Sequence, residues 1–292
     1  MSFRTRFAPS PTGPLHLGHA YSAILAHDMA MAHGGEFLLR IEDIDQSRAR
    51  PEWEQQIYDD LDWLGLTWST PVLRQSDRVT HYATQLDALW GRKLLYQCNC
   101  NRKDIAAAIA APQEGVTLVG PDGPVYPGTC RKKQIAEEVA QPMPTGQVLR
   151  LKMKYATLAS PDGFSFVETG SGTDGETGRI SFAAHEVNRN IGDIVLARRD
   201  MGTSYHLSVV LDDAAQGITH VIRGQDLFEA TKIHVVLQQL FDLQTPTYHH
   251  HKLIRDDQGK RLAKRDDARA ISKYREDGYT PDDIRKMVGL LG

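Results

Sequence analysis

Hydrophobic and polar positions in the first part of the chain alternate between strand-like and helix-like patterns. Residues 4–8 are expected to form a short buried strand, and EFLLRIED at 36–43 a second one that is apolar enough to be covered on both faces. Between them, residues 17–31 carry apolar side chains at helical spacing and end at HGG, since glycine commonly terminates a helix. Strand, helix and strand in this order predict a parallel, right-handed crossover.

The pattern changes after Tyr96. Two more helices are expected before it, at about 51–64 and 79–90, but loops rich in glycine and proline then interrupt the periodicity. We therefore predict that residues 97–186 form an insertion with small folding units of its own. The α/β pattern resumes at 187–252 with further strands and helices.

The sequence thus predicts an α/β protein whose parallel sheet is split between residues 1–96 and 187–252. The insertion at 97–186 separates the two halves. The last forty residues, 253–292, are charged and helical by pattern, and TPDDIRKMVGLL has the proline typical of a helix start.

Composition excludes several classes of protein. The 292 residues carry 34 basic and 37 acidic side chains, a formal net charge of −3, which argues against binding nucleic acid by bulk charge alone. No apolar run approaches the roughly 20 residues of a membrane span, and the N-terminus lacks the apolar core of a secretory signal. Three cysteines make no disulfide framework. We expect a cytoplasmic protein with no membrane partner, and a monomer, because no long heptad or exposed apolar stripe requires a dimer.

The segment FAPSPTGPLHLGHAYSA, residues 7–23, carries the first candidate chemistry. It leaves a strand and enters a helix, where backbone N–H groups and the helix dipole favour a bound phosphate. Gly18 lets the backbone approach a ligand closely. His16 and His19 emerge at the helix start, where imidazoles can donate to phosphate oxygens as charge builds in a displacement at phosphorus. The spacing indicates a site that stabilises a pyrophosphate leaving group, with an ordinary structural motif as the alternative for this fragment alone.

Four sequence blocks in order resemble the class I aminoacyl-tRNA synthetases in their glutamate form. RFAPSPTGPLHLGH corresponds to the family's first signature, RIEDID at 40–45 to its second, HVIRGQDL at 220–227 to its third and RLAKR at 261–265 to its KLSKS-type loop. The resemblance implies a Rossmann-type catalytic domain, with a short helical C-terminal region that contacts a tRNA stem. It also implies an ATP site, in which His16, His19 and Lys264 are catalytic, formed by His16, Gly18, His19, Arg261 and Lys264.

RLAKR departs from the family pattern at its first position. Arg261 stands where the family has lysine, which keeps the positive charge, and Lys264 is the lysine expected to reach the ATP phosphates. Mg²⁺ is expected with the ATP, bridging phosphates rather than held in a protein cage. A solvated charge run is the alternative interpretation of this segment.

The same resemblance implies that L-glutamate is the amino acid. A planar guanidinium matches the two oxygens of a side-chain carboxylate; a phenol can donate to the same group, and a carboxylate can accept from the substrate ammonium. The implied glutamate site comprises Arg6, Ala8, Ser10, Glu42, Tyr205 and Arg223. The alternative for either arginine is a structural ion pair with a nearby aspartate: Asp43, Asp45 or Asp226.

The three cysteines indicate a metal site. Cys98 and Cys100 form a CxC pair and Cys130 ends YPGTC, so three thiolates could hold zinc with one tetrahedral corner open. Tyr126 can supply the fourth ligand, and CxC…YxxxC resembles a zinc site of bacterial glutamyl-type synthetases. We expect one structural Zn²⁺ that stabilises the insertion, with reduced cysteines and a packed tyrosine as the alternative. The histidines at 249–251 point in different directions, and we expect no metal there.

A full-length glutamyl-tRNA synthetase reads its anticodon with a long C-terminal helical region, whereas this sequence runs only 27 residues past Arg265. We therefore expect no anticodon-binding domain. The chain most resembles a family of truncated paralogues, the glutamyl-Q tRNA(Asp) synthetases, with which IEDID and RGQDL agree. That resemblance implies activation of glutamate without tRNA and its transfer to queuosine at the wobble position of tRNA(Asp), in an anticodon loop whose bases can be splayed out. Arg131, Lys132 and Lys133 are then candidates for contacts with its phosphates.

Three other functions remain as alternatives. A short synthetase could charge tRNA(Glu) or tRNA(Gln). A small-molecule nucleotidyltransferase would share HxGH and the α/β sheet, but it leaves RIEDID and the CxC pair unexplained. A non-catalytic RNA-binding module could derive from a decayed synthetase, against which the intact candidate residues argue: His16, His19, Glu42, Arg223 and Lys264.

Overall fold

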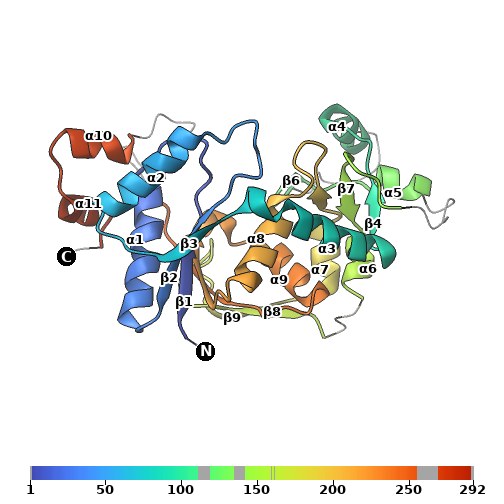
Figure 1. Cartoon of the computed structure of the whole chain (residues 1–292). Coiled ribbons are helices and arrows are strands. Elements are labelled where there is room, and N and C mark those ends of the chain that lie inside the picture. The colour runs from blue at the N-terminus through green and yellow to red at the C-terminus, as the bar shows by residue number, and fades with distance from the viewer. Residues whose placement is uncertain are drawn as a thin grey trace.

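The computed structural model shows a parallel sheet with helices on its faces and a smaller unit beside it (Figure 1). The structure describes residues 2–110, 119–134, 142–158, 160, 162–254 and 269–290. Within these residues, no helix combines the length and the apolar character needed to cross a bilayer.

The N-terminal half of the sheet is built as the sequence predicts. Strands β1 (Arg4–Phe7) and β2 (Glu36–Ile41) are parallel, and helix α1 (Leu17–Ala32) connects them. Strand β3 (Ser69–Arg74) adds to β2, also in parallel. The predicted parallel crossover is confirmed.

The second half of the sheet continues on the other side of β1. Strands β11 (His220–Gly224), β12 (Thr247–His251) and β8 (Phe164–Glu168) are parallel, and β9 (Gly178–Phe182) closes the edge antiparallel to β8. The backbone N–H of Thr219 donates to the carbonyl of Arg4 at 3.0 Å, so β11 lies next to β1. The predicted α/β class with a parallel sheet is therefore confirmed.

A second, antiparallel sheet lies at the far end of the molecule (Figure 1). It has the order β10 (Val195–Ala197), β7 (Leu149–Leu151) and β4 (Leu95–Gln97), and a small hairpin of β5 (Val119–Gly120) and β6 (Gly123–Pro124) accompanies it.

The two sheets cross both boundaries predicted for the insertion at 97–186. Strands β4 and β10 begin or end outside that range, whereas β8 and β9, inside it, belong to the parallel sheet. Sequence periodicity could not reveal this, because strand pairing joins segments far apart in the chain. The division into domains itself stays a prediction.

The helices of the described residues differ in burial: residues 206–213 of α8 (Tyr205–Ala215) are all buried, whereas the described side chains of α4 (Arg102–Ala110) are exposed or half-buried. The N-terminal helices are α2 (Pro51–Trp63), a 3₁₀ turn η1 (Gln75–Arg78) and α3 (Val79–Gly91); those that follow up to β11 are α4, α5 (Thr129–Gln134), α6 (Met153–Ala156), α7 (Ala184–Asn190) and α8. The last are η2 (Gln225–Leu227), α9 (Thr231–Leu240), α10 (Ile271–Glu276) and α11 (Pro281–Met287).

The C-terminal helices pack against α1, beside α2 (Figure 1). Ile271 and Ile284 are fully buried with the apolar face of α1, and the N–H of Ile271 donates to the carbonyl of Leu15 at 2.8 Å. Thr280 caps α11 and Pro281 opens it, as TPDDIRKM predicts. The end of the described chain therefore supports the loop that enters α1.

Candidate active site

The two histidines of the first motif lie together at the start of α1. His16 is the N-cap residue, and its Nδ1 accepts from the backbone N–H of Gly18 at 3.1 Å. The N–H of His16 donates to Nδ1 of His19 at 3.2 Å, and the two rings lie 3.8 Å apart. Both side chains thus satisfy backbone donors that a helix start leaves without partners.

Gly18 is required by this arrangement. A Cβ atom at residue 18 would lie 3.0 Å from Cε1 and 3.2 Å from Nδ1 of His16, closer than ordinary packing allows. The glycine therefore allows the His16 ring to fold over the first turn. Arg261 and Lys264 lie outside the described residues, so the second half of the expected ATP site stays a prediction.

Buried charges gather where β1, β2 and α8 meet. Asp213 accepts from Nε of Arg6 at 3.0 Å and from Nη1 of Arg40 at 2.7 Å. Nη2 of Arg40 also donates to Glu42 at 3.3 Å. All four side chains are nearly enclosed, with exposed fractions of 0% for Arg40 and 9% or less for the others.

The two carboxylates of this group differ in their electrostatics. Burial raises the pKa of Asp213, but the charges of Arg6 and Arg40 outweigh that effect and hold it below its usual range. For Glu42, burial prevails over the attraction of the same arginines and raises the pKa. As the pH falls, Glu42 is therefore protonated before Asp213, which keeps its negative charge.

Arg6 does form a buried ion pair, as the alternative interpretation expected, but its partner is not one of the aspartates named from the sequence. Arg6 pairs with Asp213, whereas Asp43 accepts from the N–H of Ser76 and Asp45 from Arg48. Two consecutive aspartates in the apolar run SVVLDDAA were a signal for Asp213, because buried carboxylates require partners.

Arg223, at the end of β11, is held by neutral partners. Nε donates to Nε2 of His250 at 3.0 Å and Nη1 to Nδ1 of His234 at 3.1 Å. Nη2 donates to Oγ1 of Thr231 at 2.6 Å and to the carbonyl of Leu227 at 3.2 Å. The Nε–Nη2 edge that a bidentate carboxylate would need is therefore already occupied.

The phenol of Tyr205 is buried within the electrostatic reach of both arginines. Burial raises the pKa of its phenol; the nearby charges of Arg223 and Arg6 lower that pKa, and those of Glu42 and Asp213 raise it. The charges of two arginines and two carboxylates therefore act on one phenol. The loop after β1 with Ala8 and Ser10 lies beside the end of β2, because the N–H of Glu42 donates to the carbonyl of Pro9 at 3.0 Å.

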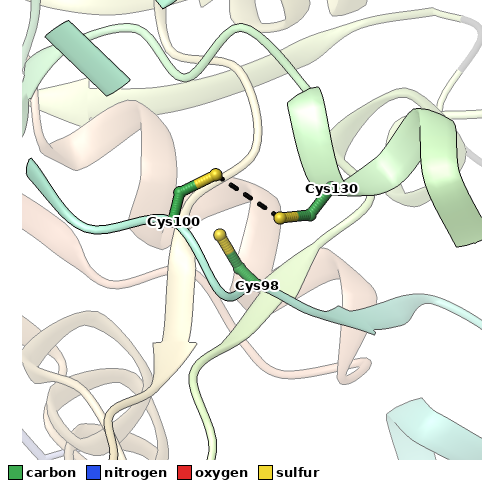
Figure 2. Close-up of side chains that lie close together, drawn as sticks. All are labelled: Cys98, Cys100 and Cys130. Carbon is green, nitrogen blue, oxygen red and sulfur yellow. Dashed lines mark hydrogen bonds between the residues drawn. The ribbon is translucent and has the colours of Figure 1, made fainter. Parts of the chain in front are cut away.

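The cysteines form a cluster in the second unit (Figure 2). The Sγ atoms of Cys98, Cys100 and Cys130 all lie within 4.8 Å of one another, with 3.4 Å between Cys100 and Cys130. The phenol oxygen of Tyr126 lies 3.5 Å from Sγ of Cys98 and 3.4 Å from that of Cys100. Around a tetrahedral metal with bonds of about 2.3 Å, ligand sulfurs are separated by nearly 4 Å. The three cysteines can hold a metal ion, and the phenol oxygen of Tyr126 lies within 3.5 Å of two of their sulfurs.

The environment of the cluster favours a thiolate at Cys130. Burial raises the pKa of this thiol, but hydrogen bonds from Tyr126 and from the N–H of Asn99 lower it to about 7. Burial raises the pKa of Cys100 and of Tyr126. The Arg150 guanidinium lies 4.0 Å from the centre of the Tyr126 ring, so a cation is close to the phenol.

Arg131, one of three basic groups considered for tRNA, has a structural role. Its Nη1 donates to Oδ2 of Asp193 at 2.7 Å, and the same oxygen accepts from Tyr96 at 2.7 Å. Asp193 is buried. This contact ties the cysteine-bearing helix α5 to the second sheet. The side chains of Lys132 and Lys133 lie outside what the structure describes.

A cavity of about 450 Å³ lies between the second unit and the start of α8. Its walls include Ile105 and Ile109 of α4, Asp122 of the β5–β6 hairpin, Tyr126 of the cysteine cluster and Tyr205 of the buried charge group. The cavity combines apolar walls with a few charged groups, which is typical of a pocket for a small molecule or a single nucleoside.

The fold and these two clusters define a class I aminoacyl-tRNA synthetase. The chain belongs to the family "tRNA synthetases class I (E and Q), catalytic domain", whose model matches residues 2–292. By family it is a ligase of the aminoacyl-tRNA synthetase type, and the family resemblance of the four sequence blocks is confirmed.

Individual proteins similar to this chain indicate the branch of the family to which it is most alike. "Glutamyl-Q tRNA(Asp) synthetase" of Rhodobacter capsulatus is 61% identical, over 98% of this chain and 99% of that protein. The protein of the same name from Nitratidesulfovibrio vulgaris is 37% identical, over 99% of this chain and 86% of its own length. The solved structure of a glutamate tRNA ligase from Elizabethkingia meningosepticum, in complex with its amino acid, matches with a TM-score of 0.73 at 27% identity. It covers all of this chain, which spans 61% of the ligase.

Proposed function

We propose that this enzyme activates L-glutamate with ATP, without tRNA, and transfers it to queuosine at the wobble position of tRNA(Asp). The observation that carries the proposal is the near full-length similarity to the Rhodobacter capsulatus protein, 61% identical over 99% of its length. The buried charges of Arg6, Glu42 and Arg223, which act on one another or on the phenol of Tyr205, support glutamate as the amino acid.

Activation requires an α-carboxylate oxygen of glutamate to bond to the α-phosphorus of ATP while pyrophosphate leaves. In this proposal His16 and His19, at the positive end of α1, donate to the phosphates as charge builds on them. Lys264 and Arg261 neutralise the leaving pyrophosphate, and Mg²⁺ bound with the ATP would supply further positive charge there. Gly18 keeps the backbone close to the nucleotide.

The amino acid is held by charges of both signs. Glu42 accepts from the substrate ammonium. The side-chain carboxylate is bound by the Tyr205 hydroxyl and by those N–H groups of Arg6 and Arg223 that the protein contacts described above leave available. The sequence predicted a single bidentate guanidinium instead. Ala8 and Ser10 line the loop beside it. Because buried donors are left unpaired by an analogue that lacks the carboxylate, such sites discriminate by roughly 10⁴ or more.

We further propose that Cys98, Cys100, Cys130 and Tyr126 bind one structural Zn²⁺. The thiolate character of Cys130 and the spacing of the sulfurs support this assignment. The ion, when bound, supplies folding energy to the second unit and no chemistry to the reaction.

The acceptor nucleoside is proposed to enter the cavity between α4, the β5–β6 hairpin and α8. Its volume suits a single nucleoside, and it lies next to Tyr205 of the proposed glutamate site. A base splayed out of an anticodon loop is a suitable occupant. We also propose that the enzyme acts in the cytoplasm, where its tRNA acceptor is found. The proposal of a monomer rests on the sequence, in which no long heptad or exposed apolar stripe requires a dimer.

Two measurements test the proposal. Glutamate-dependent exchange of pyrophosphate into ATP is expected without any tRNA, and no exchange would exclude tRNA-independent activation. Labelled glutamate is then expected to become bound to tRNA from cells that make queuosine and not to tRNA from cells that lack it. Equal labelling of both would favour a short synthetase charging tRNA(Glu) or tRNA(Gln).

A further inference from the structure

A continuous chain of hydrogen bonds leads from Arg223 to the surface of the second unit. Nη1 of Arg223 contacts Nδ1 of His234 at 3.1 Å, and Nε2 of His234 contacts Nδ1 of His206 at 3.0 Å. Nε2 of His206 lies 2.9 Å from both carboxylate oxygens of Asp122. Both histidines are buried, whereas the side chain of Asp122 is 54% exposed.

The chemistry of Arg223 fixes the direction of every bond in this chain. A guanidinium only donates, so Nδ1 of His234 must accept and carries no proton. Its Nε2 therefore bears the hydrogen and donates to Nδ1 of His206, which in turn leaves the hydrogen of His206 on Nε2, facing Asp122. Burial, together with the nearby charge of Arg223, lowers the pKa of His234 well below its usual range, consistent with a neutral ring.

A second branch leaves Arg223 in the opposite direction. Nε of Arg223 donates to Nε2 of His250, so the hydrogen of that ring lies on Nδ1, where it contacts Oε2 of Glu168 at 2.5 Å. Glu168 also accepts from the backbone N–H groups of His250 and Gly170. One cation is thus linked through neutral imidazoles to two carboxylates, and its plane is fixed from both sides.

Asp122 is held in place by the β5–β6 hairpin. A Cβ atom on Gly120 would lie 2.5 Å from the carbonyl oxygen of Asn190, so the hairpin packs directly against the end of α7. Asp122 also lines the 450 Å³ cavity, near Arg150 and Arg198. A group in the second unit, far from Arg223 in sequence, is therefore connected to the residue that we propose binds glutamate.

From this chain we infer that Asp122, His206 and His234 are positioning residues for Arg223, through which the β5–β6 hairpin influences glutamate binding. The inference rests on the proposed function, because Arg223 must be a glutamate ligand. The carboxylate holds the hydrogen of His206 on Nε2. Without the Asp122 carboxylate, His206 can carry its hydrogen on Nδ1, where it would face the N–H of His234. If His234 then moved its own hydrogen to Nδ1, that hydrogen would face the N–H of Arg223.

The kinetic test is glutamate-dependent ATP–pyrophosphate exchange with Asp122→Ala and Asp122→Asn. We expect Asp122→Ala to raise the KM for glutamate roughly fivefold or more, the range of coupling between linked sites, with the KM for ATP and kcat nearly unchanged. Asp122→Asn, whose amide oxygen can still accept from His206, should recover part of the loss. Glu276→Ala is the matched control, since it removes a part-exposed carboxylate from Lys273 at another place on the surface.

A second measurement shows directly which ring nitrogen of each histidine carries the hydrogen. In ¹⁵N–¹H spectra of histidine-labelled wild-type protein, we expect His206 and His234 to carry their hydrogen on Nε2 and His250 on Nδ1, and we expect His206 to change in Asp122→Ala. An unchanged KM in Asp122→Ala, or the opposite ring nitrogens carrying the hydrogens in the wild type, would overturn the inference. A wild-type enzyme that shows no exchange would instead contradict the proposed function.

Discussion

Arg6 and Asp213 form a two-pronged pair across 207 residues of sequence, with Nε to Oδ1 at 3.0 Å and Nη2 to Oδ2 at 3.4 Å. Arg6 belongs to β1, at the start of the first sequence block, and Asp213 to α8. Asp213 therefore fixes the orientation of an arginine that is proposed to bind the substrate, and it also holds the fully buried Arg40.

Substituting Asp213 with asparagine should impair both binding and stability. Removing one partner of a buried ion pair costs about 3–5 kcal/mol, and Arg6 loses its orientation, so the KM for glutamate should rise at least tenfold. The matched control is Asp212→Asn. That neighbour binds Arg78, Gln75 and Tyr82 instead, so it should lower the melting temperature without a selective effect on glutamate. Similar KM values for the two variants would contradict the role of Asp213.

The stability lost in Asp213→Asn should depend on pH. The pKa of Asp213 is lower in the folded protein than in the unfolded chain, so its stabilising contribution is present above the unfolded value of about 3.9. That contribution is lost as the pH falls through the folded pKa. The difference in unfolding free energy between wild type and Asp213→Asn should therefore be full at neutral pH and shrink in acid. A difference independent of pH would contradict this assignment.

Glu42 should make glutamate binding sensitive to acid. Because burial raises its pKa, the side chain gains a proton at a higher pH than an exposed glutamate, near 4.3, would. The KM for glutamate should then rise as the pH is lowered towards the raised value. Glu42→Gln should show a high KM that no longer varies over this range, measured by ATP–pyrophosphate exchange. Glu36→Gln, at the other end of β2 where it pairs with Arg4, should keep the wild-type profile.

Gly18→Ala should slow activation while the protein stays folded. The added methyl group would lie 3.0 Å from the His16 ring, and displacing a catalytic group by a few tenths of an ångström should lower the exchange rate roughly tenfold. Gly91→Ala serves as the control, because a Cβ there contacts nothing within 4 Å. An unchanged rate in Gly18→Ala would argue that His16 does not act on the phosphates.

Elemental analysis of natively purified protein should find one zinc per chain. Cys98→Ser should lose the metal and lower the melting temperature, because the cluster anchors the second unit. Tyr96→Phe removes a buried hydroxyl that bonds Asp193 beside the cluster, and it should lose stability but retain zinc. Full zinc content in Cys98→Ser would contradict the metal assignment.

The sequence predicted those parts of the molecule that depend on local patterns. The strand–helix–strand unit and the emergence of His16 and His19 at a helix start follow from periodicity and helix-start chemistry. Each involves residues close in sequence or neighbouring elements, so the physical constraint acts within a short segment. The grouping of Cys130 with the CxC pair, 30 residues from Cys100, rested instead on ligand chemistry and the family resemblance.

Local sequence patterns could not predict which residues or strands far apart in the sequence pair with each other. Asp213 as the partner of Arg6, and the placement of β8 beside β12, depend on which distant segments meet in the folded chain. Likewise, nothing local indicates that Arg223 is held by histidines from β12 and α9 rather than by an aspartate. Pattern reasoning singled out Arg6, Glu42 and Arg223 but could not assign the partners that hold them.

The central claim is that the activated glutamate ends on the anticodon of tRNA(Asp). The most direct test is to incubate the enzyme with labelled glutamate, ATP and queuosine-containing tRNA, digest the product with nuclease and identify the labelled nucleotide. The account predicts label on queuosine at the wobble position of tRNA(Asp). Label on the 3′-terminal adenosine of tRNA(Glu) or tRNA(Gln) would contradict it.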